Sequence, residues 1–212
     1  MRPAAVAVKH FPMILRSTSA SPFGRKVRIA IALLGLGDKI EIQETDLNNP
    51  DDTIRKQNPL GKIPALVLDD GRTFFDSRVI LDYLDHVTGG GRIIPRDANA
   101  RFEALRMQAL CDGVLDASLL IIYEGRYRPE DKHVSGWLER QADKVTRGLD
   151  ALEAAPPAIT PVPDVGQITL ACALGYRDFR FPKDDWRSRY PRLRAWLDKF
   201  SAQVPAFAAT KP

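Results

Sequence analysis

The 212-residue sequence contains only two cysteines and three histidines, and it has no long apolar run. Cys111 and Cys172 lie far apart and no CxxC pair exists, so neither a disulfide framework nor a metal site is indicated. Two isolated cysteines are typical of a reducing compartment, and we expect a cytoplasmic location. No stretch approaches the roughly 18 apolar residues of a membrane span, and residues 1–10 lack the apolar core of a signal peptide. We therefore expect no membrane partner.

A strong excess of one charge is also missing, because 31 basic and 27 acidic residues give a net charge of +4. The basic residues are spread along the chain, and the densest group is Arg25–Arg28. Nucleic-acid binders concentrate such residues on a patch or stripe, so we expect no nucleic-acid partner. Hydrophobic residues at 44% and charged residues at 27% are ordinary values for a globular protein with a sizeable core.

The chain divides into two parts with different patterning, separated by the turn-rich stretch from Thr88 to Pro95. In the first part, residues 11–88, short segments alternate between strand and helix spacing, and Asp69–Arg72 carries the Asp-Gly signal of a hairpin. The expected order β-α-β-α-β-β-α is that of a thioredoxin-like α/β domain. The expected strands are 11–16, 40–45, 65–68 and 73–75, and the expected helices are 22–34, 51–57 and 76–86.

The second part, residues 97–207, is predicted to be an all-helical domain. Helical spacing covers residues 99–124, 130–152, 164–178 and 191–203, and four prolines between 156 and 163 require a loop. Asp164-Val-Gly-Gln167 has the form of a capping box at a helix start. The alanine-rich tail from Val204 is expected to fray.

Three short segments carry side chains that suit a ligand. Pro64 stands directly before a strand, where a trans proline in a turn is the simplest interpretation. A cis Ile63–Pro64 bond is the alternative, and it would turn the backbone N–H and C=O of Ile63 outward to pair with an extended peptide. Asp76 and Ser77 open a helix whose dipole attracts an anion. Ser77 would donate to a carboxylate and Asp76 would accept from an ammonium group, unless Asp76 serves only as a cap.

The third segment is Ser21-Pro22, which has the residue types of a helix N-cap followed by position N1. A serine hydroxyl can both cap a helix and donate to a thiol. A free cysteine thiol has a pKa of about 8.5, and a hydroxyl donor at a helix N-terminus would favour the thiolate near neutral pH. Both the capping role and the thiol role therefore stay open for Ser21.

The order of these segments resembles the glutathione transferase family. The resemblance runs from Met13 to Phe207 and includes Asn58–Pro64 and the helical stretch Leu170–Arg180. It implies a bacterial, serine-type member that binds glutathione as co-substrate, attacks a small hydrophobic electrophile in detoxification, and forms a homodimer. Conjugation, isomerisation and reductive dehalogenation all remain open, and so does a non-catalytic binding or regulatory member.

The resemblance also assigns roles to residues. Ile63, with Pro64 cis, would hold the cysteinyl backbone of glutathione, and Asp76 and Ser77 would hold the γ-glutamyl end. Lys62, or Asn48 or Asn49, would meet the glycine carboxylate. Ser21 would contact the thiol, with Ser19 as the competing candidate. The family's second-substrate pocket would be lined by Phe23, Tyr123, Arg126 and Tyr127, although the tyrosines would also fit simple packing at a helix end. A disulfide oxidoreductase on this fold would need a cysteine at the first helix start, and Ser21–Gly24 contains none.

Overall fold

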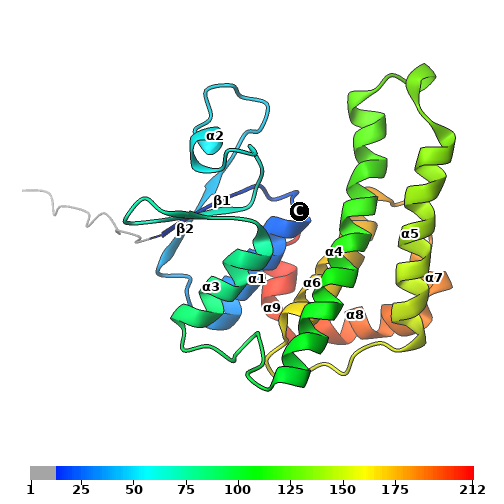
Figure 1. Ribbon diagram of the computed structural model, residues 1–212. Coiled ribbons are helices and arrows are strands. Elements are labelled where there is room, and N and C mark those ends of the chain that lie inside the picture. Colours follow the sequence, from blue (N-terminus) through cyan, green and yellow to red (C-terminus); the bar gives the residue numbers. More distant parts are fainter. Residues whose placement is uncertain (1–12) are drawn as a thin grey trace, which may run out of the picture.

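The computed structural model describes residues 13–212, and it shows a small mixed sheet with helices followed by an all-helical part (Figure 1). The predicted order β-α-β-α-β-β-α is confirmed. Residues 11 and 12 of the first expected strand lie outside the described residues. The elements of this first part are β1 (Met13–Ser17), α1 (Pro22–Leu34), β2 (Ile40–Glu44), α2 (Ile54–Gln57), β3 (Ala65–Leu68), β4 (Thr73–Phe74) and α3 (Ser77–Val87).

The sheet has the strand order β2-β1-β3-β4. β1 runs parallel to β2 and antiparallel to β3, which places the fully buried Leu15 between Ile42 and Leu66. The β3–β4 hairpin turns at Gly71, whose φ of 83° suits glycine, as the Asp-Gly signal predicts. Figure 1 shows α1 and α3 on one side of the sheet and α2 on the other.

The second part begins with a long helical hairpin, α4 (Ala98–Tyr127) and α5 (Ser135–Ala154), against which α6 (Val165–Arg180) packs. The helix expected from residue 130 begins five residues later. A 3₁₀ turn, η1 (Glu130–Lys132), comes first, and the extended backbone of His133 and Val134 separates it from α5. The remaining helices are α7 (Trp186–Arg189), α8 (Pro191–Gln203) and α9 (Pro205–Ala209). No helix of residues 13–212 is long and apolar enough to cross a membrane.

The C-terminal tail corrects one expectation, because it forms α9 instead of fraying. Phe207 is buried and packs edge-on against Phe200 at 5.7 Å between ring centres. The guanidinium of Arg25 in α1 stacks over the Phe207 ring and donates to its carbonyl oxygen at 2.6 Å. This contact depends on a residue 182 positions earlier in the chain, which local composition does not reveal.

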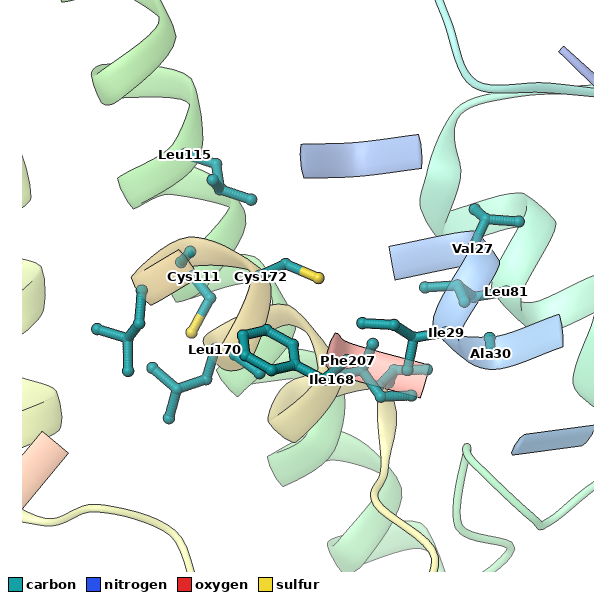
Figure 2. Close-up of a cluster of buried hydrophobic side chains, with 14 of the residues drawn as sticks. Val27, Ile29, Ala30, Leu81, Cys111, Leu115, Ile168, Leu170, Cys172 and Phe207 are labelled. Carbon is teal, nitrogen blue, oxygen red and sulfur yellow. The ribbon is translucent and has the colours of Figure 1, made fainter. Parts of the chain in front are cut away.

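The two parts share one continuous hydrophobic core. Figure 2 shows Ile29 of α1 pointing toward Ile168 of α6 and Phe207 of α9, which belong to this core. Such burial contributes about 1.5–3 kcal/mol for each large aliphatic side chain. The core therefore fixes the position of α1 relative to α4 and α6, and with it the position of any site between them.

Two carboxylates anchor the segments that join the helices. Asp85 is buried in α3 and accepts from the backbone N–H groups of Gly91, Arg92 and Ile93 at 2.7–2.9 Å, which fixes the linker to α4. Asp164 accepts from the N–H of Gln167 at 2.9 Å, as the predicted helix cap requires. The Gln167 side chain, however, also donates to the carbonyl of Ala158 and holds the preceding loop.

Candidate functional site

Three chain segments meet at one edge of the sheet. Arg16 pairs with Ala65 between β1 and β3, and Leu66 pairs with Phe74 between β3 and β4. The segment after β1, the segment before β3 and the segment after β4 are therefore neighbours. These are the segments that contain Ser21, Ile63-Pro64 and Asp76-Ser77.

A cleft of about 150 Å³ lies at this edge, between the sheet domain and α4. Six of the residues singled out in the sequence line it, namely Phe23, Lys62, Ile63, Pro64, Asp76 and Ser77. The cleft thus combines an apolar wall with a cation, a carboxylate and a hydroxyl. This combination suits a zwitterionic, peptide-like ligand.

The Ile63–Pro64 peptide bond is cis, which is the alternative that the resemblance implies. Pro64 is buried, and Ile63 is half-buried. The side-chain amide of the buried Asn58 donates to the carbonyl of Lys62 at 2.8 Å and supports this loop. Within residues 13–212, the backbone N–H and C=O of Ile63 form no hydrogen bond, so both are free to pair with a ligand.

Asp76 and Ser77 form the start of α3. Asp76 is the N-cap and accepts from the N–H of Arg78 at 2.9 Å, as the capping interpretation predicts. Asp76 also lines the cleft, so the cap and a ligand contact are compatible. Ser77 is buried, and its hydroxyl has no hydrogen-bond partner among the described residues. A helix N-terminus with a free hydroxyl donor favours a carboxylate.

A buried ion network forms the floor of the cleft, and sequence reasoning missed it. Asp112 of α4 is 1% exposed and binds the ammonium of Lys26 at 2.6 Å and the guanidinium of Arg78 at 2.8 Å. Lys26 lies in α1 and is itself fully buried, 5.6 Å from the centre of the Phe23 ring. The network therefore connects the helical part to two helices of the sheet domain.

Asp116 stands one helical turn beyond Asp112 and also lines the cleft. Partial burial, and then the charge of Asp112, raise the pKa of the Asp116 carboxyl above its ordinary value, while nearby cations oppose the rise. The i, i+4 spacing of the two aspartates was visible in the sequence. Which face of the long helix meets the sheet domain was not.

The two serine candidates lie outside the lining of this cleft. Ser21 is the N-cap of α1, and its hydroxyl oxygen accepts from the N–H of Gly24 at 3.1 Å, which leaves its O–H free to donate. Together with Tyr176 and Pro212, Ser21 lines a shallow hollow. Phe23, in the first turn of the same helix, lines the cleft. Ser19 is exposed, and its carbonyl accepts from Arg28 at 2.9 Å.

Cys172 also lines the hollow beside Ser21, but it is fully buried. Burial raises the pKa of its thiol to about 11, so it stays protonated and unreactive at neutral pH. Burial likewise raises the pKa of the Cys111 thiol. The two cysteines are therefore packing residues.

The remaining candidates for a second-substrate pocket lie further along α4. Tyr123 is half-buried and Tyr127 is 66% exposed, and their ring centres are 5.3 Å apart in an edge-on arrangement. The guanidinium of Arg126 lies 5.6 Å from the Tyr123 ring centre. Of the expected pocket residues, Phe23 alone lines the cleft.

Comparison with known proteins identifies the class to which this fold and cleft belong. Residues 20–87 match the family "Glutathione S-transferase, N-terminal domain", and residues 135–199 match "Glutathione S-transferase, C-terminal domain". The chain is also 32% identical over 203 residues to the uncharacterized GST-like protein YibF of Escherichia coli K12, covering 94% of this chain and 98% of YibF. The chain belongs to the glutathione S-transferase family.

Two solved bacterial structures are similar over nearly the whole chain. A glutathione S-transferase from Methylobacillus flagellatus, solved with GSH bound, has a TM-score of 0.88 at 35% identity and covers 94% of this chain and 99% of its own. A glutathione transferase family member from Pseudomonas fluorescens, solved with bound glutathione, has a TM-score of 0.86 at 42% identity and covers 94% and 98%.

Breaking the buried ion pair between Lys26 and Asp112 is expected to destabilise the fold strongly. Lys26→Met leaves the Asp112 carboxylate buried with one of its two partners, and we expect a loss of about 3–5 kcal/mol in the free energy of unfolding, measured in urea. The double variant Lys26→Met/Asp112→Leu should recover much of this loss, because an apolar pair can replace a buried ion pair. Arg72→Met, in the exposed pair with Asp70, is the control and should leave stability nearly unchanged. A loss for Lys26→Met no larger than that of the control would contradict this role.

Proposed function

We propose that the chain is a glutathione transferase that activates the glutathione thiol for attack on a small hydrophobic electrophile. The observation that carries the proposal is the meeting of the free Ile63 backbone groups with Asp76 and Ser77 in one cleft. Glutathione is a peptide-like zwitterion and requires this combination of partners. The glutathione bound in similar bacterial structures supports the same ligand here.

In this proposal each part of glutathione has a partner. The cysteinyl backbone pairs with Ile63 next to Pro64, and the γ-glutamyl carboxylate meets Ser77 at the N-terminus of α3. The γ-glutamyl ammonium lies near Asp76, and Asp116, which also lines the cleft, adds negative charge there. Lys62 is exposed at the cleft margin and would pair with the glycine carboxylate.

Ser21 is proposed as the residue that donates to the thiol. Its hydroxyl sits at the N-terminus of α1, where the helix dipole favours an anion, and capping leaves the O–H available. Ser19 is the weaker candidate because its neighbours include the Glu44 carboxylate, which accepts from the Ser19 N–H at 3.4 Å. A thiolate held by Ser21 would lie beside the hollow lined by Tyr176, where the electrophile would approach.

A non-catalytic member that binds glutathione is the second candidate. The position of Ser21 outside the cleft lining is the observation that favours it, since a residue that only caps α1 needs no contact with ligand. Turnover separates the two candidates, because both predict glutathione binding.

We also propose the cytoplasm as the location and 11–88 and 97–207 as the two domains.

The role of Ser21 is tested by substitution. Ser21→Ala should lower kcat for a generic chloronitrobenzene about 100-fold, the usual effect of losing one donor to a developing anion, with glutathione affinity within about threefold. The rise of kcat/KM with pH should move to higher pH, because the thiol pKa is no longer lowered. Ser21→Gly, which costs only a few tenths of a kcal/mol at an N-cap, separates this effect from lost stability.

Ser19→Ala is the matched control and should behave as the wild type. Parallel losses of turnover and of glutathione affinity in Ser21→Ala would show that Ser21 is only a cap. Loss of turnover in Ser19→Ala instead would transfer the thiol role to Ser19.

We further propose that the chain forms a homodimer through α3 and the start of α4. Val79 and Phe102 expose 46% and 67% of their side chains on these two helix segments, which the Arg101–Asp82 pair joins at 3.7 Å. Leu60 at the cleft margin is 66% exposed and adds apolar surface. Apolar side chains exposed to this degree on neighbouring helices are typical of an interface.

Phe102→Glu should therefore convert the dimer to a monomer at micromolar concentration, because a buried unpaired carboxylate opposes association. Light scattering coupled to size exclusion measures the mass. Val162→Glu changes another exposed apolar residue in a loop and should leave the dimer intact. A wild-type chain that is monomeric, or a Phe102→Glu variant that stays dimeric, would rule out this interface.

A further inference from the structure

Two helix faces extend from the proposed site toward the far end of α4. On α4, the spacing that places Asp112 and Asp116 at the cleft brings Leu120, Tyr123 and Tyr127 onto the same face. On α6, Cys172 and Tyr176 line the hollow beside Ser21, and Arg180 lies one turn beyond Tyr176. We call the group Tyr123, Arg126, Tyr176 and Arg180 the cationic cluster.

The members of the cationic cluster act on one another across the two helices. Burial raises the pKa of the Tyr176 hydroxyl, and the charge and hydrogen bonding of Arg180 oppose the rise. Burial also raises the pKa of the Tyr123 hydroxyl, with Tyr127 adding to the rise and Arg126 and Arg180 opposing it. Both phenols therefore stay protonated at neutral pH and can donate hydrogen bonds.

The two arginines of the cluster carry charge that the described chain does not neutralise. Within residues 13–212, neither Arg126 nor Arg180 forms an ion pair with a carboxylate. The neighbouring Arg128 and Arg177 do, with Glu124 and Asp184. Arg180 is half-buried, stacks over Phe179 at 4.1 Å, and has a buried Nε with no partner among the described residues.

Aromatic rings and two unpaired guanidinium groups in one cluster have a defined chemical preference. The rings favour an aryl or other apolar body, and an arginine favours a carboxylate through paired charge-assisted bonds. Phenol hydroxyls that remain protonated add further donors. An electrophile that is only apolar would contact the rings but would leave the guanidinium groups to solvent.

We propose that the second substrate is an anionic electrophile, an apolar or aryl body carrying a carboxylate, which the cationic cluster orients toward the thiolate beside Ser21. This inference rests on the proposed function. In the reaction, the thiolate forms a C–S bond as the C–Cl bond of an aryl chloride breaks. Chloride leaves with the bonding pair, and the thiol proton passes to solvent.

The test compares two glutathione conjugates that differ in one group. In each conjugate the sulfur carries a phenyl ring with a nitro group ortho to the sulfur. The position para to the sulfur carries a carboxylate in one conjugate and a carboxamide in the other. By calorimetry, the wild-type chain should bind the carboxylate conjugate about tenfold more tightly, as expected for charge-assisted bonds. Higher salt should reduce this preference, because the arginines are partly exposed.

Substitution then assigns the preference to the cluster. The double variant Arg126→Gln/Arg180→Gln should bring the two conjugates within about twofold of each other, with affinity for glutathione itself unchanged. Arg194→Gln removes an exposed charge on α8 and should keep the wild-type preference. Thermal unfolding checks that each variant is folded.

The outcomes separate this inference from the proposed function. Glutathione binding without preference for the carboxylate conjugate in the wild type would overturn the inference and leave the proposed function standing. A preference that survives in the double variant would also overturn it. No glutathione binding at all would overturn the proposed function and this inference together.

Discussion

The buried carboxylate of Asp112 joins the helical part of the molecule to the sheet domain. An ionised carboxylate with so little exposure needs partners, because burial of an unpaired charge costs several kcal/mol. Its two partners come from α1 and α3, so α4 can satisfy its own charge only when it is docked on the sheet domain. Asp76 and Ser77 lie at the start of α3. The docking of α4 therefore brings Asp112 and Asp116 to the same cleft as Asp76 and Ser77.

The apolar core and the C-terminal helix reinforce the same arrangement. Arg25 precedes Lys26 in α1, and its side chain extends to α9, where it stacks on the Phe207 ring and donates to the Phe207 carbonyl. α1 is therefore held by an ion pair on one side and by a cation–aromatic contact on the other. With α1 fixed in this way, Ser21 lies at the hollow and Phe23 lies at the cleft.

Much of this could be predicted from local sequence. Periodicity and the Asp-Gly turn predicted the strands and helices. Ile63-Pro64 and Asp76-Ser77 were candidates because proline before a strand and an acid at a helix start have local physical causes, whereas Lys62 was a candidate only through the family resemblance. Asp112, Asp116 and the docking of Phe207 depend on contacts between distant segments, which no local pattern contains. The cationic cluster was only partly visible, because Tyr176 and Arg180 meet Tyr123 through the packing of α6 against α4.

The central claim is that glutathione spans the cleft and reaches Ser21 with its sulfur. A crystal structure of the chain with glutathione tests it most directly. We expect the cysteinyl backbone to pair with Ile63, the γ-glutamyl carboxylate to lie at Ser77, and the sulfur to lie within hydrogen-bonding distance of the Ser21 hydroxyl. Glutathione bound with its sulfur away from α1, or with its γ-glutamyl end away from Ser77, would contradict it.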